Sequence, residues 1–185
     1  MTGNTRARLH AYASTTARTV SMALGVAAAI GLALWLVRPP FSPLLLASLG
    51  GSTVFLFCLN DAPAAQPRAL FGGHFGSALI GIVCYQMFGD GLWVAVMAVV
   101  LGLLLMLGTK TVHPSAGANP LIMIYGHAGF GALWQPVGLG VLILFLVACA
   151  WSRIDRWSVR YPQNFMEPSP PPAIPTHGAT DRSQT

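Results

Sequence analysis

Long apolar runs, separated by short gaps that contain proline, glycine or charged residues, make up most of this chain. Four of these runs have about the length that an α-helix needs to cross a hydrocarbon core roughly 30 Å thick. Two further runs are interrupted by small and polar residues. An alternating pattern of short strands is not visible, so a β-barrel is not expected. The pattern predicts an all-α, polytopic transmembrane bundle of six apolar segments, at residues 20–37, 44–60, 70–88, 92–109, 113–134 and 137–151.

The second and fifth apolar segments carry polar residues and helix interrupters in their middle; the fifth lies within KTVHPSAGANPLIMIYGH, residues 110–127. Inside a bilayer, non-helical backbone is tolerated only where protein or a water-filled cavity satisfies its N–H and C=O groups. We therefore expect two broken or re-entrant helices that line a permeation or substrate site. The candidate residues of the two segments, joined by one histidine of the third segment, are Ser48, Gly50, Gly51, Ser52, Thr53, His74, His113, Ser115, Gly117, Asn119 and His127.

The two broken segments also indicate an internal repeat. Placing residues 48–57 over 115–124 aligns a serine, a glycine and a following apolar run, and a Gln-Pro pair precedes both the third and the sixth segment. Paired interrupted segments are typical of the two halves of transporters. The transmembrane domain, residues 20–151, is thus expected to contain repeats at about 20–88 and 92–151. They are inverted relative to each other if both broken segments cross the membrane.

Charged residues lie mainly at the ends of the chain and in the gaps, where they act as topology signals. Residues 1–19 contain Arg and no acid and predict a cytoplasmic tail, and the polar, proline-rich residues 152–185 predict a largely disordered cytoplasmic tail. Six crossings leave only Arg38 outside, whereas four crossings with re-entrant second and fifth segments also place Arg68 and Lys110 outside. Six is favoured and four stays open. The expected location is a bacterial inner membrane.

Four short motifs give the chain a resemblance to a known family: SLGG at residues 48–51, AQPR at 65–68, GGH at 72–74 and HPSAGA at 113–118. Together they resemble the HPP family of small integral membrane proteins, over about residues 39–151. Ser115 stands in the place of the second proline of the family's His-Pro-Pro motif. The resemblance implies four membrane spans, and it implies nitrite transport, so a small monovalent anion is the first substrate to consider.

Such an anion requires hydrogen-bond donors without a fixed strong cation that would hold it too tightly. Free N–H groups at helix N-termini meet this requirement, because the helix dipole attracts an anion with roughly half a charge. The runs SLGGST and SAGANP supply glycines that let a ligand approach the backbone, and hydroxyl and amide side chains that add donors. The two segments are expected to face each other near the membrane midplane. The alternative is that their small residues only allow close helix packing.

Each candidate histidine and cation has two open roles. His113 either donates to the anion or carries a coupled proton, or it caps a helix and holds the loop. His74 and His127 each follow a glycine and either line the same cavity or bond neighbouring helices. Arg68 and Lys110 either attract anions to a cytoplasmic mouth or anchor the topology.

Several other classes of function are not expected. The histidines do not recur at ligand spacing with acids, the apolar spans contain no Asp or Glu, and three distant cysteines support neither a disulfide framework nor a zinc site. We therefore expect no metal, cofactor, enzymatic activity or nucleic-acid partner. The leading hypothesis is a transporter or channel for a small inorganic anion, in the lipid bilayer and as a homo-oligomer. The alternative is a non-transporting membrane scaffold or sensor.

Overall fold

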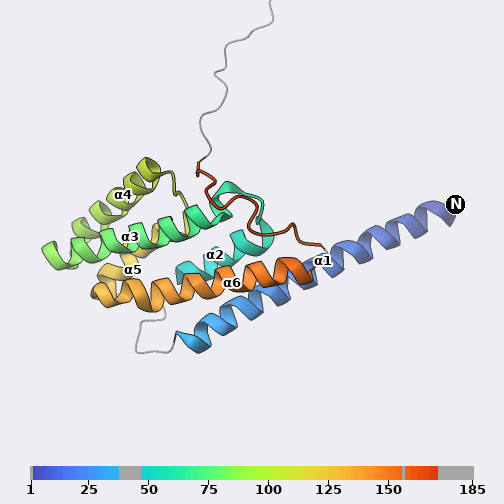
Figure 1. Ribbon diagram of the computed structural model, residues 1–185, viewed down its shortest axis with the longest axis horizontal. Coiled ribbons are helices and arrows are strands. Elements are labelled where there is room, and N and C mark those ends of the chain that lie inside the picture. Colours follow the sequence, from blue (N-terminus) through green and yellow to red (C-terminus); the bar gives the residue numbers. More distant parts are fainter. Residues whose placement is uncertain (1, 38–46, 156, 171–185) are drawn as a thin grey trace, which may run out of the picture.

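The computed structural model describes residues 2–37, 47–155 and 157–170, with residues 2–13 described by their backbone alone. These residues form six α-helices and no strand (Figure 1). The all-α prediction is therefore confirmed for the described chain. The helices are α1 (Thr2–Leu36), α2 (Ala47–Cys58), α3 (Pro67–Phe88), α4 (Leu92–Thr109), α5 (Asn119–Tyr125) and α6 (Leu139–Ile154).

Four helical stretches are long and apolar enough to cross a membrane: Ser14–Leu36, Pro67–Phe88, Leu92–Thr109 and Phe130–Ile154. Where the structure describes them, the second and fifth of the six predicted segments contain the short α-helices α2 and α5, of 12 and 7 residues. At 1.5 Å per residue these helices are about 18 and 10 Å long, well short of a bilayer core. The fifth segment is interrupted, as expected, by the 3-10 turn Pro114–Ala118, whereas the described part of the second is one short helix that continues through Gly50 and Gly51.

Local sequence signals explain several helix ends. α3 begins with Pro67 in its first turn, where the missing N–H of proline costs nothing. It ends at Gly89, whose φ of 80° suits glycine. Lys110 ends α4 in the left-handed conformation, with φ of 55°. The fifth segment enters α5 through a 3-10 turn, Pro114–Ala118, that separates α5 from the extended residue His113.

The long helices run in two directions (Figure 1). α1 and α3 both run away from the end of the molecule at which the chain starts, and α6 runs back toward that end. α4 is joined to α3 by a tight Gly-Asp-Gly turn and packs along it as a hairpin. The stretch between α1 and α3 must therefore carry the chain back from one end to the other, and so must the stretch between α4 and α6.

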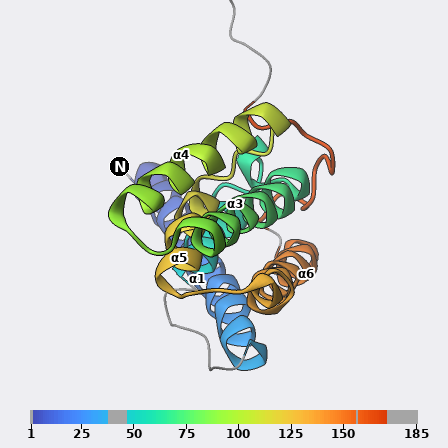
Figure 2. The same cartoon turned by 90° about the vertical axis from the view of Figure 1, so that its left-hand side faces the viewer.

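The short helices lie between pairs of long ones. α2 packs against α1 and α6, α5 packs against α3 and α4, and α2 also contacts the Pro114–Ala118 turn. The view along the long axis shows α4 at the top and α5 below it, next to α3 (Figure 2). The main apolar core includes Leu49 and Leu56 of α2, Ile82 of α3 and Leu144 of α6. Both broken segments are thereby placed in the interior of the bundle.

Two helices extend beyond the predicted segments. α1 already begins at Thr2, although residues 1–19 were expected only as a tail, and α6 continues to Ile154. The sequence TRARLHAYASTTARTV contains no proline or glycine that would end a helix, so the first span simply continues outward.

Residues 157–170 correct the expected disorder of the C-terminal tail, because this stretch, here called the C-terminal strap, docks on the loop between α2 and α3. The Tyr161 hydroxyl donates to the Ala65 carbonyl at 2.8 Å. The Gln66 side chain accepts hydrogen bonds from the backbone N–H groups of Gln163 and Asn164. These bonds give a proline-rich segment a defined path that no helix or strand pattern would reveal. Residues 171–185, the rest of the expected tail, lie outside the described residues.

The end of the strap is fixed beside the fifth segment. Ser169 and Lys110 are joined by a backbone N–H···O bond of 3.0 Å, and the Val112 N–H donates to the Ser169 carbonyl at 2.8 Å. The Ser169 hydroxyl donates to the Val112 carbonyl at 2.7 Å. The strap thus touches both the α2–α3 loop and the residues that immediately precede His113.

The Tyr161 phenol predicts a pH limit for this docking. Burial raises the pKa of Tyr161 above its ordinary value of 10.0, so the docked state favours the neutral phenol. Tyr161 therefore contributes fully to the docking free energy below about pH 10. This contribution is lost as the pH rises further, because the tyrosine of an undocked strap ionises at a lower pH than the docked tyrosine. We expect Tyr161→Phe to weaken docking by about 1 kcal/mol and to remove this pH dependence. Limited proteolysis of the strap between pH 8 and pH 11, with exposed Tyr125→Phe as control, measures both effects.

Candidate functional site

Four buried polar side chains from different segments meet inside the bundle, and we call them the buried network. α2 contributes Ser52, α3 contributes His74, the residue before the 3-10 turn contributes His113, and α5 contributes Asn119. Both histidines and Ser52 have no exposed surface, and Asn119 is 1% exposed. All four are candidates that the sequence pattern predicts, and the fold brings them into direct contact.

Ser52 is the centre of the network. Its Oγ lies 2.8 Å from His74 Nε2 and 2.9 Å from His113 Nε2. The same hydroxyl is 2.9 Å from the Ser48 carbonyl one helical turn earlier. A serine hydroxyl has one proton and two lone pairs, so it can donate to one of these groups while it accepts from another.

The partner at one end of the network determines the tautomer of His113. Its Nδ1 lies 2.6 Å from the Ala64 carbonyl oxygen in the α2–α3 loop. A carbonyl only accepts, so Nδ1 carries the proton, and Nε2 of the neutral ring is an acceptor for the Ser52 hydroxyl. His113 is packed closely against α3 at its Cβ, because a Cβ added to Gly73 would lie 2.9 Å from the His113 Cβ.

The partner at the other end determines the tautomer of His74. The Asn119 amide nitrogen lies 3.0 Å from His74 Nδ1 and 3.1 Å from the His74 carbonyl. The His74 carbonyl can only accept, so the Asn119 atom that contacts it is the amide nitrogen and not the amide oxygen. The same nitrogen faces the imidazole ring, so His74 Nδ1 accepts a hydrogen bond from it. His74 Nε2 then carries the proton and donates to Ser52. The hydrogen bonds therefore run in one direction, from Asn119 through His74 and Ser52 to His113 and Ala64.

The network is neutral in this arrangement and its donors are satisfied. The ring centroids of the two histidines are 5.1 Å apart, and Phe55 lies 5.3 Å from the His113 ring. Within the described parts of the chain, the one carboxylate–histidine pair is that of Asp90 and His127, so neither buried imidazole has an acidic partner. Such a network can exchange donors with a ligand or accept a proton.

The two broken segments meet beside the network, as their sequences predict. The Ser115 hydroxyl donates to the Ser48 carbonyl, the same oxygen that lies next to Ser52. Gly51 permits this contact, because a Cβ there would lie 2.5 Å from the Ser115 hydroxyl oxygen. Thr53 is also buried, but its hydroxyl donates to the Gly50 carbonyl of its own helix. The expected polar hollow is therefore closed here, since the Ser115 and Thr53 hydroxyls donate to backbone carbonyls.

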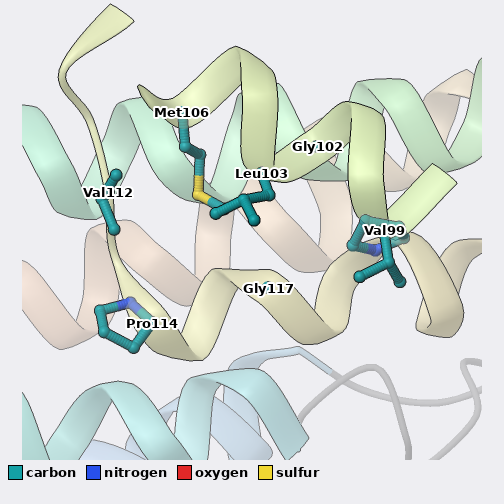
Figure 3. Close-up of a pocket in the computed structure, with 8 residues that line it drawn as sticks. Val99, Gly102, Leu103, Met106, Val112, Pro114 and Gly117 are labelled. Carbon is teal, nitrogen blue, oxygen red and sulfur yellow. The ribbon is translucent and has the colours of Figure 1, made fainter. Parts of the chain in front are cut away.

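A cavity of about 300 Å³ lies on the other side of the Pro114–Ala118 turn, between that turn and α4 (Figure 3). Gly117 borders it, and Figure 3 shows Val112 and Pro114 on one side with Val99 and Leu103 of α4 facing them. The wall is almost entirely apolar. Its lining residues are Val99, Gly102, Leu103, Met106, Val112, Pro114, Gly117 and Pro120.

His127 lies outside the buried network. It is exposed, its Nε2 lies 2.9 Å from an Asp90 carboxylate oxygen, and its ring stacks on Tyr85 at a centroid distance of 5.1 Å. The hydrogen bond from His127 lowers the pKa of the Asp90 carboxyl. The pair thus links the α3–α4 turn to the end of α5 at the surface.

The two candidate cations also lie apart from the network. Arg68 donates to the Thr109 carbonyl at 2.8 Å, so it caps the C-terminal end of α4. Lys110 is exposed next to it. Both therefore lie at the same end of the bundle as the C-terminal strap. This position fits both open roles, as anchors of the topology or as cations that attract anions to a cytoplasmic mouth.

The sequence analysis missed two parts of this site. The Ala64 carbonyl is backbone and leaves no signal in a side-chain pattern. Gln66 holds the strap with its Oε1 and donates from Nε2 to the Asn60 carbonyl at 2.9 Å, whereas the sequence pointed to it only through the repeated Gln-Pro pair and the AQPR motif. A buried glutamine in an apolar protein was the available signal for it.

The fold defines an integral, polytopic α-helical membrane protein with four candidate spans and a polar network in its core. The chain belongs to the HPP family, whose description "HPP, transmembrane region" matches residues 10–162. It is similar to two proteins of Dictyostelium discoideum, both described as transmembrane proteins, with 36% and 35% identity over 120 residues. The match covers 60% of this chain but 42% and 39% of those relatives, so the chain spans about two fifths of their length. No solved structure matches the chain.

Proposed function

We propose that this protein is a membrane transporter or channel for a small monovalent anion, with nitrite as the first candidate, and that the buried network forms part of its path. The network is the observation that supports the proposal most. Four segments from both halves of the chain place polar side chains in the centre of an otherwise apolar bundle. Polar residues at membrane depth are costly and mark substrate or ion pathways. The choice of nitrite rests on the HPP resemblance.

The packing of the helices supports an inverted repeat around this path. α2 of the first half packs against α1 and α6, and α5 of the second half packs against their counterparts α4 and α3. The aligned serines, Ser48 and Ser115, contact each other, and the aligned pair Ser52 and Asn119 binds the two sides of His74. Paired broken helices that meet at a pseudo-two-fold axis are the arrangement in which transporters place their substrates.

In the proposed topology both broken segments cross the membrane, which gives six crossings. The parallel directions of α1 and α3 support this path, because the intervening stretch must return to the first side. Arg68 and Lys110 then lie at a cytoplasmic mouth together with both termini, in a bacterial inner membrane. The large apolar side chains exposed on α1 and α4 face lipid or a second copy in a homo-oligomer.

The charge distribution favours an anion. Every described acidic residue, Asp61, Asp90, Asp155 and Glu167, lies outside the four candidate spans. The network offers imidazole, hydroxyl and amide donors, which bind anions without a fixed positive charge. In the observed closed arrangement these groups form hydrogen bonds with one another. An anion therefore enters by accepting hydrogen bonds that are now made within the network or between Ser115 and the Ser48 carbonyl.

Flux measurements in liposomes test the proposal. We expect the purified protein to carry nitrite faster than empty vesicles, with nitrate, formate and chloride as competitors. Gly117→Leu should reduce the flux at least about tenfold, because the leucine fills the cavity behind the turn. Gly31→Leu is the matched control, since neither glycine has an atom within 4 Å of an added Cβ. A folded wild-type protein that carries none of the four anions would contradict the proposal and leave the scaffold or sensor function.

A further inference from the structure

We propose that the buried network takes up one proton on His113 for each anion that it binds, so that the protein moves an anion and a proton together without net charge. This inference rests on the proposed anion transport and adds its coupling ion. It follows from the direction of the hydrogen bonds, the position of one shared carbonyl and the absence, among the described residues, of a carboxylate partner for the two buried histidines.

His113 can accept the proton without breaking the network. In the neutral state its Nε2 accepts from the Ser52 hydroxyl, while Nδ1 donates to Ala64. When a proton binds to Nε2, this atom becomes a donor to Ser52 Oγ, and the Ser52 hydroxyl turns to the Ser48 carbonyl, which is already 2.9 Å away. Every donor then still has an acceptor, because Ser52 accepts from both histidines and donates to Ser48.

His74 cannot accept the proton in the same way. Its unprotonated nitrogen is Nδ1, which already accepts from Asn119, and a proton there would face the Asn119 amide nitrogen at 3.0 Å, so that two donors would oppose each other. A rotation of the amide would relieve this conflict only by turning the Asn119 oxygen toward the His74 carbonyl, which now accepts from the amide nitrogen at 3.1 Å. The arrangement therefore selects His113 as the proton acceptor.

A proton on His113 needs a counter-charge that the described residues do not supply. The titratable group that faces the ring is His74 on α3, and the other contacts are Ser52 and Phe55 of α2 and the Ala64 carbonyl. Asp61 in the adjacent loop is exposed, and in the described chain it makes no ion pair with a histidine. Arg68 and Lys110 on the neighbouring segments, and neutral Tyr161 on the strap, add no negative charge. A buried unpaired imidazolium is strongly unfavourable, so a bound anion has to accompany it.

The Ser48 carbonyl links the two binding events. It accepts from Ser115 and lies within reach of Ser52. Gly51 is exposed and Ser115 is partly exposed, so an anion can approach from this side and receive the Ser115 hydroxyl. The carbonyl is then left to Ser52, whose hydroxyl can turn toward it as His113 becomes protonated. Anion binding thereby favours proton uptake, and proton uptake favours anion binding, as linkage requires.

The experiment measures proton and nitrite movement in the same liposomes, with a pH-sensitive dye inside, the membrane potential set by potassium and valinomycin, and the rate of empty vesicles subtracted. We expect one proton to enter with each nitrite and the rate to be independent of the potential. His113→Asn keeps an amide donor for the Ala64 carbonyl but removes the proton acceptor, and it should reduce coupled flux at least about tenfold. His127→Asn, at the exposed histidine, should retain the coupling.

A binding measurement separates coupling from transport. Addition of nitrite to the weakly buffered protein in detergent should raise the pH through proton uptake by the wild type and by His127→Asn, and not by His113→Asn, at a temperature at which melting curves show that all three are folded. Nitrite entry that follows the membrane potential and moves no protons would overturn the inference and leave the proposed transport intact. An absence of any protein-dependent flux and binding would overturn both.

Discussion

Replacing Ser52 with alanine is expected to destabilise the protein strongly and to abolish anion flux. The substitution removes the acceptor of the His74 Nε2–H and the donor to His113 Nε2 at the same time. Both groups are fully buried, so neither finds water as a substitute. Each orphaned polar group costs about 1–3 kcal/mol, which makes this the largest loss that one hydroxyl can cause here. Thermal melting in detergent and the liposome flux measure the two effects.

Ser77→Ala is the matched control for this prediction. Ser77 is also on a buried helix face, has no exposed surface and donates to a carbonyl one turn earlier, that of Gly73 at 2.6 Å. It does not bridge the histidines, and its loss leaves a helical carbonyl that is already bonded within the helix. We expect Ser77→Ala to melt near the wild type. If the two serine variants lose equal stability and both still carry anions, Ser52 is an ordinary helix serine and the network is not a functional unit.

The helices of this protein could be predicted because their signals are local. Uniform apolar runs gave α3 and α4 within a few residues, and the Gly-Asp-Gly turn between them has the glycine at φ 80° that such a turn requires. The repeat alignment compares two distant segments and placed Ser48 and Ser115 at equivalent positions, and the fold brings these two serines into contact. Periodicity did not show where α1 begins, because its polar outer turns continue a helix that nothing in the sequence stops.

The contacts within the site could not be predicted, because they join residues that are distant in the sequence. Ser52 is 61 positions from His113, and the tautomers depend on the Ala64 carbonyl and the Asn119 amide, whose positions only the packed helices determine. His127 illustrates the same limit. It shared the glycine-histidine pattern of His74, but it lies at the surface beside Asp90. The composition of a segment indicates that polar groups need partners and does not say which partners they find.

The C-terminal strap was missed for a related reason. Its proline-rich composition is typical of disordered tails, and the bonds that hold it come from the backbone and from Gln66 and Ser169. Its position still bears on the site, because Tyr161 binds the Ala65 carbonyl next to the Ala64 carbonyl that accepts from His113. The α2–α3 loop, at which the buried network ends, is therefore bound both by Tyr161 of the strap and by His113.

Gly81→Ala is expected to be the most disruptive small substitution at the contact between α3 and α5. A Cβ at Gly81 would lie 2.7 Å from Pro120 Cα and 2.9 Å from the Pro120 carbonyl oxygen. These are backbone atoms, so no side chain can rotate away, and α5 has to move. Overpacking of this kind costs about 1–3 kcal/mol or more. Because Asn119 directly precedes Pro120, the shift also draws its amide away from His74, so we expect flux and melting temperature to fall together.

Replacing Gly31 with alanine should instead raise the melting temperature. Gly31 is exposed on α1, and no atom lies within 4 Å of an added Cβ. Alanine is favoured over glycine inside a helix by about 0.5–1 kcal/mol, so Gly31→Ala should melt slightly above the wild type and keep its flux. Melting curves of both variants in one detergent provide the comparison. A Gly81→Ala protein as stable as Gly31→Ala would mean that α5 does not pack on α3 at this distance, and the geometry that places Asn119 beside His74 would be wrong.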